Sequence, residues 1–162
     1  ARLKYLVGEQ LGVDSRNVHA FIIGEHGDSE LAVWSSANIS GIDLKDFCNL
    51  SGKSISMENI YNIYNYVRES AYKIIDSKGA TYYAIAMAAL RIVECIVRDE
   101  KSVIPVSTLV EGEYGISGVC MGLPSIVGRN GVERILEIPL NKNESENLLN
   151  SAKEISEYIE ID

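Results

Sequence analysis

Apolar residues recur at helical spacing in the first half of the chain, and this spacing predicts two helices. The first begins with Leu3, Leu6 and Val7 and stops at Gly12, because glycine readily ends a helix. The second is a long helix from Met57 to Ser77. Its apolar face consists of Met57, Ile60, Tyr61, Tyr64, Val67, Ala71, Ile74 and Ile75.

Two more helices follow from the same spacing. One opens at Thr81 and is apolar on most of its sides, which predicts a place in the centre of the core. The other starts at Asn143, with Glu146 three residues later in the arrangement of a capping box. Its apolar stripe consists of Leu148, Ala152, Ile155 and Ile159.

Compact apolar runs separated by turn residues predict strands. These runs span residues 18–23, 31–34, 103–110, 119–127 and 135–138. Strands joined by hairpins, with the helices grouped elsewhere in the chain, are typical of an α+β fold with an antiparallel sheet packed against long helices. No repeat, low-complexity tract or linker divides the sequence, so residues 1–162 are interpreted as one domain.

Composition excludes several classes of function. The 162 residues carry a net charge of −8, which disfavours binding to nucleic acids or anionic membranes. The longest apolar stretch, residues 84–90, is far shorter than the roughly 20 residues that span a bilayer. The three scattered cysteines, Cys48, Cys95 and Cys120, match no metal-binding spacing and predict reduced, buried thiols in a cytoplasmic protein.

Glycine spacing bears on cofactor binding. The thirteen glycines never occur as Gly-x-Gly, so the dinucleotide-binding fingerprint is absent from these residues. A nucleotide cofactor would therefore be held mainly by another domain. The helical pattern is already under way at Ala1, without a capping residue, which indicates that the chain was cut from a longer protein.

His26 is the residue best placed for proton transfer. It lies between Gly24 and Gly27 in a polar loop that follows a hydrophobic strand, and histidine exchanges protons readily near neutral pH. Two other interpretations stay open on composition alone. His26 could be a solvated turn residue, or it could bind a metal with Glu25 and Asp28.

Several segments resemble the L-lactate dehydrogenases. The clearest is residues 21–29 (FIIGEHGDS), which are followed by Trp34 and Ser35 and are similar to the active-site segment of that family. Residues 1–4 (ARLK), 78–86 (KGATYYAIA), 106–108 (VST) and 122–127 (GLPSIV) resemble other family segments, in the family's order. The resemblance covers essentially the whole chain, and it implies the C-terminal domain of the lactate/malate dehydrogenase fold, without its NAD-binding Rossmann domain.

The resemblance implies a role for each matching residue. His26 would be the acid/base that protonates the keto oxygen of pyruvate, and Arg2 would bind the substrate carboxylate. Thr81 would line the substrate pocket, and Ile85 would contact the nicotinamide ring of NAD. Without the resemblance, Arg2 would be interpreted as a solvated helix residue, Thr81 as a helix start and Ile85 as a core position.

The family's orienting partner for the histidine is an aspartate that would lie two residues before Ala1. Asp28 is close in sequence, but the family does not use that position for this purpose. No metal is expected.

A regulatory site is implied by two further residues. Lys4 and His19 match positions where fructose-1,6-bisphosphate-activated bacterial enzymes carry a basic residue and a histidine, between subunits of a tetramer. The match is imperfect, because arginine is usual at the Lys4 position. An exposed lysine and a strand-edge histidine remain the alternative interpretation.

The resemblance implies reversible, NADH-dependent reduction of pyruvate to L-lactate by a homo-oligomer, expected to be a tetramer. One alternative is a lactate-like malate or 2-hydroxyisocaproate dehydrogenase. The other is a folded assembly module that is inactive when isolated.

Overall fold

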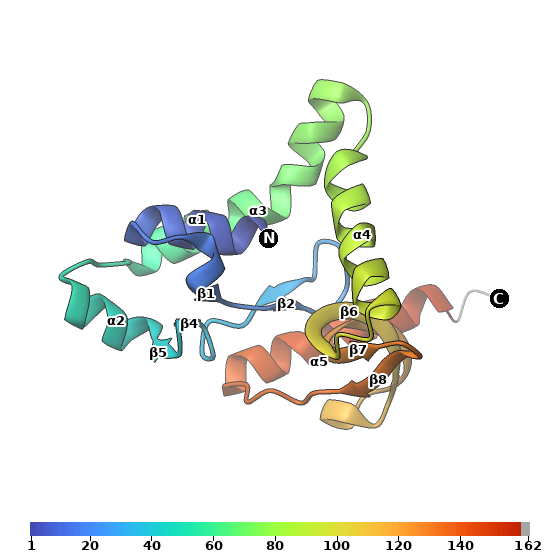
Figure 1. Ribbon diagram of the computed structural model, residues 1–162. Helices are drawn as coiled ribbons and strands as arrows, with labels where there is room; N and C mark the ends of the chain where they lie inside the picture. Colours follow the sequence, from blue (N-terminus) through green and yellow to red (C-terminus); the bar gives the residue numbers. More distant parts are fainter. Residues whose placement is uncertain (160–162) are drawn as a thin grey trace.

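The computed structural model describes residues 1–159 and has the α+β architecture that the sequence predicts (Figure 1). The helices are α1 (Arg2–Leu11), α2 (Leu44–Ser51), α3 (Met57–Lys78), α4 (Tyr83–Val97) and α5 (Lys142–Ile159), with 3-10 turns η1 (Ser15–Asn17) and η2 (Glu113–Gly115). The strands are β1 (Val18–His19), β2 (Ile22–Ile23), β3 (Leu31–Ala32), β4 (Asn38–Ile39), β5 (Ile42–Asp43), β6 (Ser102–Glu111), β7 (Ser117–Gly128) and β8 (Gly131–Ile135). They form three antiparallel sheets with the orders β1-β4-β5, β2-β3 and β6-β7-β8.

The larger core lies between the β6-β7-β8 sheet, the β2-β3 ribbon and α5. Alternate residues of β7 face this core, which explains the burial of Val119, Met121 and Leu123. From α5, Leu148 and Ala152 pack into the same core, as the predicted stripe requires, whereas Ile159 at its end is exposed. This packing fixes α5 beside the β2-β3 ribbon.

A second core joins α1 to β1, β4, α2 and the first half of α3. Leu3, Val7 and Leu11 are buried from α1, and the helix ends at Gly12, which is left-handed (φ 67°) as predicted. Partly buried residues of α3, such as Tyr64 and Val67, cover this core from one side. Because α1 packs against α3, the start of the chain is held close to the long helix.

The prediction that α4 is central to the core is wrong. The second half of α3 and most of α4 project from the body as an arm (Figure 1), and most of α4 is exposed. Only Cys95, near the end of α4 that packs against β7, is buried. An apolar helix gains stability only where other residues cover it, and residues 1–159 provide no such cover for α4.

Charged residues hold the base of this arm. The Arg91 guanidinium lies 2.7 Å from the carboxylate of Glu100 and also donates to Ser102 at the start of β6 (3.0 Å). The hydrogen bond from Arg91 lowers the pKa of Glu100 to about 2. The direction of α4 is therefore fixed where it joins the sheet.

Several boundaries differ from the prediction, among them the following three. Residues 18–23 form one extended segment that pairs with two different sheets, through β1 and β2. The third strand of the large sheet begins at Gly131 rather than Ile135, because a two-residue loop joins it directly to Gly128. The capping box of α5 is formed by Asn141 and Glu144, each donating a backbone N–H to the other's side chain at 2.9 Å, and not by Asn143 and Glu146.

The prediction of buried thiols holds only in part. All three cysteines are free, and Cys95 is buried, but Cys48 is half-buried and Cys120 is exposed. Cys120 alternates with the buried residues of β7 and so faces outward. Within residues 1–159, no helix has the length and apolarity needed to cross a membrane.

Candidate active site

The loop that carries His26 connects β2 to β3 and is anchored to the rest of the domain at its start. Gly24 exchanges two backbone hydrogen bonds with Gly122 of β7, at 2.9 and 2.7 Å. The backbone N–H of Glu25 donates to Ser151 of α5 at 2.8 Å. The His26 side chain itself is exposed, so the loop presents an accessible imidazole on a fixed backbone.

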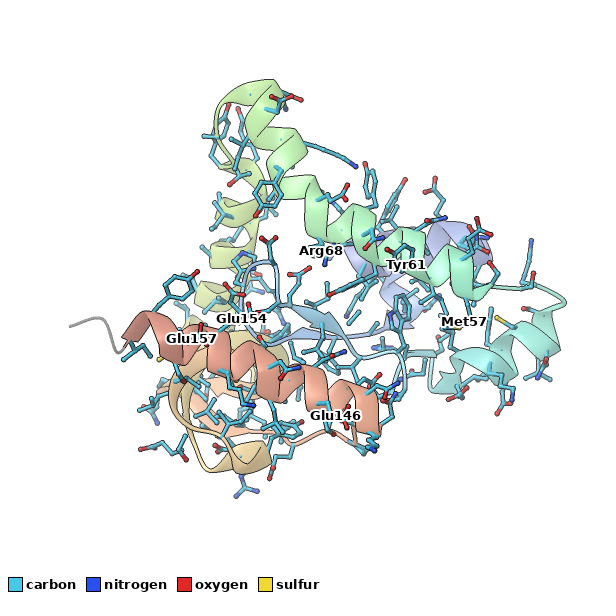
Figure 2. The ribbon with its side chains drawn as sticks, turned by 180° about the vertical axis from the view of Figure 1, so that it is seen from behind. Met57, Tyr61, Arg68, Glu146, Glu154 and Glu157 are labelled. Atoms are coloured by element: carbon cyan, nitrogen blue, oxygen red, sulfur yellow. The ribbon has the colours of Figure 1, made fainter. Side chains whose placement is uncertain are left out.

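Acidic residues lie near His26, and two of them, Glu25 and Asp28, accept hydrogen bonds from other side chains. Asp28 accepts a hydrogen bond from the hydroxyl of Tyr72 on α3 (3.1 Å), which raises the pKa of Tyr72. Partial burial raises the pKa of Glu30, while the nearby positive charges of His26 and Arg68 oppose that shift. Arg68 projects from α3 (Figure 2). Asp28 thus ties the loop to α3.

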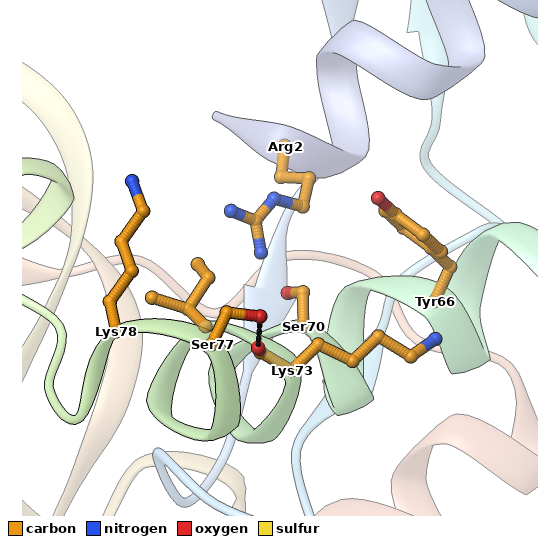
Figure 3. A pocket seen from close by; sticks show the side chains of 7 residues that line it. Arg2, Tyr66, Ser70, Lys73, Ser77 and Lys78 are labelled. Carbon is orange, nitrogen blue, oxygen red and sulfur yellow. Dashed lines mark hydrogen bonds between the residues drawn. The ribbon is translucent and has the colours of Figure 1, made fainter.

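Arg2 faces a cavity of about 230 Å³ between the start of α1 and the second half of α3. Its guanidinium points toward Ser70 and Ser77, beside Lys78 (Figure 3). Lys73 also lines the cavity, although its ammonium group is paired with Glu69 at 3.2 Å, so the charged lining residues are all cationic. This arrangement suits a small anion such as a carboxylate.

Thr81 and Ile85 lie on the exposed arm. The turn between α3 and α4 uses Gly79 in a left-handed conformation (φ 79°), and α4 begins at Tyr83 instead of Thr81. Both Thr81 and Ile85 are exposed, Ile85 by 60%. The interpretation of Ile85 as a core residue of this domain is therefore wrong.

Lys4 and His19 come from packed elements. Lys4 is half-buried on α1, and His19 is exposed on β1, which packs against α1. His19 also pairs in register with Asn38 of β4. The placement is compatible with the predicted effector site and with an exposed lysine near a strand-edge histidine.

The structure brings two parts of the predicted site to one stretch of α3. The Arg2 cavity includes Ser70 and Ile74, and Tyr72 between them contacts the His26 loop through Asp28. Among residues 1–159, no hydrogen bond or ion pair joins His26, Arg2 and Thr81 directly. A substrate would have to bridge these side chains.

Sequence reasoning missed the residues that hold the loop. Ser151, Ser29 and Tyr72 form its side-chain contacts, and no local motif marks Ser151 or Tyr72 for this purpose. In the described part of the chain, histidine, cysteine, aspartate and glutamate form no group of three that could hold a metal ion.

Comparison with known proteins places this arrangement in a family. A family profile described as lactate/malate dehydrogenase, alpha/beta C-terminal domain, matches residues 1–161. The chain belongs to this family. It is 51% identical over 160 residues to L-lactate dehydrogenase 1 of Clostridium acetobutylicum, covering 99% of the chain and 51% of that protein. It is 49% identical to the L-lactate dehydrogenase of Thermoanaerobacter sp. strain X514, with the same coverage.

Solved structures agree with the family assignment. The crystal structure of MGS-M5, a lactate dehydrogenase from a Medee basin deep-sea metagenome library, superposes with a TM-score of 0.93 at 40% identity, over 98% of this chain and 51% of that one. The minor L-lactate dehydrogenase of Enterococcus mundtii, in a ligand-bound form, gives 0.91 at 36% identity, over 98% and 50%. The family domain described here spans about half the length of the curated relatives it matches.

Proposed function

We propose that this domain is the substrate-binding and catalytic part of an L-lactate dehydrogenase that reversibly reduces pyruvate to L-lactate with NADH. The observation that carries the proposal is the anchored loop with an exposed His26, in a chain about half identical to proteins named L-lactate dehydrogenase. The NAD-binding domain would belong to the longer protein.

Three side chains of this domain would act on the substrate. His26 gives a proton to the keto oxygen of pyruvate and takes it back from the hydroxyl of lactate. Arg2 binds the substrate carboxylate through two parallel hydrogen bonds, which its planar guanidinium permits. The cationic cavity in front of Arg2 supports this role. Thr81, which is exposed at the turn before α4, would line the substrate pocket.

The residues present fit a contact with NAD. Ile85 offers an exposed apolar side chain on α4, as a contact with the face of a nicotinamide ring requires. When bound, the cofactor supplies or accepts the hydride. Ile85 orients the ring, and the apolar surface around it excludes water.

The exposed apolar residues of the arm support an assembly. Large apolar side chains are exposed on this arm, among them Tyr72, Tyr83, Met87 and Val97. Burial of such side chains against a partner would be favourable, because it removes apolar surface from water. We propose that the NAD-binding domain and neighbouring subunits of a cytoplasmic homotetramer cover the arm.

The test of the function is an NADH-oxidation assay on the longer protein that contains this domain. Pyruvate should be reduced far better than oxaloacetate or 2-oxoisocaproate, and the 162-residue chain alone should not oxidise NADH. A preference for either other keto acid would favour a malate or 2-hydroxyisocaproate dehydrogenase. NADH oxidation by the isolated chain would contradict the proposal that a separate domain binds NAD.

We further expect fructose-1,6-bisphosphate to activate the longer protein through Lys4 and His19. The sugar carries about four negative charges near neutral pH, since the second pKa of each phosphate is about 6. Two Lys4–His19 pairs facing each other across subunits would repel one another without it, so the sugar would favour the assembled arrangement. Added salt should weaken the activation.

The measurement is pyruvate saturation with and without the sugar. The Lys4→Gln/His19→Ala double variant should lose the activation, whereas Lys153→Gln, which removes one exposed charge from α5, should keep it. Full activation of the double variant would place the effector elsewhere.

A further inference from the structure

Ser151 of α5 contacts both ends of the loop that carries His26. Its side chain is completely buried, and its hydroxyl oxygen lies 2.8 Å from the backbone nitrogen of Glu25. The same oxygen lies 3.1 Å from the hydroxyl of Ser29. Glu25 and Ser29 are separated from Ser151 by more than a hundred residues of sequence, so α5 links the two ends across the fold.

The hydrogen bonds among Glu25, Ser29 and Ser151 can all be donated in one direction around a ring. Ser29 donates both its hydroxyl and its backbone N–H, the latter at 3.2 Å, to the carboxylate of Glu25. Because the Ser29 hydroxyl donates its hydrogen to Glu25, the Ser29 oxygen is left to accept a hydrogen bond from the hydroxyl of Ser151. The Ser151 oxygen in turn accepts from the N–H of Glu25, and the ring of hydrogen bonds closes.

The backbone at Gly24, next to the ring, is closely packed on two sides. Gly24 has a φ of 99°, and a Cβ built on it would lie 2.8 Å from the Ser151 hydroxyl oxygen. On the other side, Gly24 is paired twice with Gly122 of β7. The segment that enters the loop is therefore confined between α5 and β7.

We propose that Ser151, acting with Glu25 and Ser29, is a positioning residue for His26. His26 lies between the two anchored ends, and its exposed side chain makes no hydrogen bond to the ring within residues 1–159. Its direction depends on the backbone that the ring fixes. The inference rests on the proposed function, because it assumes that His26 transfers the proton.

The test is stopped-flow NADH oxidation in a single turnover, with the longer protein preloaded with NADH and mixed with pyruvate. The amplitude reports the fraction of active sites, and the rate constant reports how well each site is arranged. Ser151→Ala leaves the partly buried N–H of Glu25 without its acceptor. We expect its rate constant to fall about 10- to 100-fold, with the amplitude and the NADH affinity unchanged.

Ser156→Ala is the matched control, because Ser156 lies five residues further along α5 and, within residues 1–159, its hydroxyl donates only to Ala152 of the same helix (3.0 Å). It should react like the wild type. Ser29→Ala removes the second hydroxyl of the ring but keeps the bond between Ser151 and Glu25, and should slow the reaction about 3- to 10-fold. If Ser151→Ala does not fold, the rate constant of Ser29→Ala tests the positioning role instead.

A wild-type rate constant in the folded variants would overturn the positioning role. A reduced amplitude with an unchanged rate constant would also overturn it, since that result indicates loss of folded sites alone. A wild-type protein that does not reduce pyruvate would instead refute the proposed function, and this inference with it.

Discussion

Replacement of His26 by alanine should reduce pyruvate turnover by roughly 10²- to 10⁴-fold, the usual contribution of a positioned acid/base. His26 is exposed on an anchored loop, and no side-chain hydrogen bond of the fold depends on its imidazole within the described residues. NADH affinity and thermal stability should therefore change little. The measurement is steady-state turnover in the longer protein, with NADH binding followed by fluorescence.

The pH dependence separates proton transfer from a passive role of His26. Pyruvate reduction consumes one proton and lactate oxidation releases one. If His26 transfers that proton, pyruvate reduction should decline and lactate oxidation should rise as the pH increases. His26→Gln keeps a polar side chain of similar size but cannot transfer a proton, so it should lose this opposite pH dependence together with activity. Turnover within a few-fold of the wild type in either variant would rule out His26 as the proton donor.

Local sequence patterns predict the elements whose formation depends on residues close together in sequence. The spacing of Leu3 and Val7 and the glycine at position 12 specify α1, because the core face and the left-handed stop are both local properties. The alternation along β7 likewise follows from one buried and one exposed face. The loop around His26 was identified as polar and glycine-flanked for the same reason.

The wrong predictions concern residues whose surroundings are set by distant parts of the fold. A local sequence pattern indicates that a residue should be buried or hydrogen-bonded, but it does not identify the residue that it contacts. The apolar composition of α4 predicts a buried helix, but residues 1–159 leave most of it exposed. The cap of α5 was placed two residues too late because Glu144 had a rival in Glu146 at the same spacing. Glu144 prevails because it also accepts the backbone N–H of Ser35 at 3.0 Å, a contact between distant segments.

The candidate site likewise contains residues that sequence motifs indicate and one residue that only the fold reveals. His26, Arg2 and Thr81 were found through motifs that resemble a family, and the structure shows that Arg2 faces a cavity and His26 lies on an anchored loop. Ser151 could not be found, since a serine on a polar helix gives no signal of its own. Only folding brings it to within 2.8 Å of the nitrogen of Glu25.

Arg2→Gln should weaken the binding of pyruvate and of its unreactive analogue oxamate together. Two charge-assisted hydrogen bonds to the carboxylate are removed, so the binding free energy should become less favourable by about 3–6 kcal/mol. That loss corresponds to roughly 10²- to 10⁴-fold in affinity. The measurement is oxamate binding to the NADH complex of the longer protein, which separates binding from chemistry.

Two further variants determine whether the effect belongs to the guanidinium of Arg2. Arg2→Lys keeps the charge but replaces the planar fork by a single ammonium group, so it should recover only part of the affinity. Arg129→Gln removes an equally charged but exposed side chain at the turn between β7 and β8, and should leave oxamate binding unchanged. Lys73 and Lys78 would remain in the cavity of every variant, so charge alone would still attract an anion. If Arg2→Gln bound oxamate as tightly as the wild type, these lysines would be the carboxylate site and the role proposed for Arg2 would be wrong.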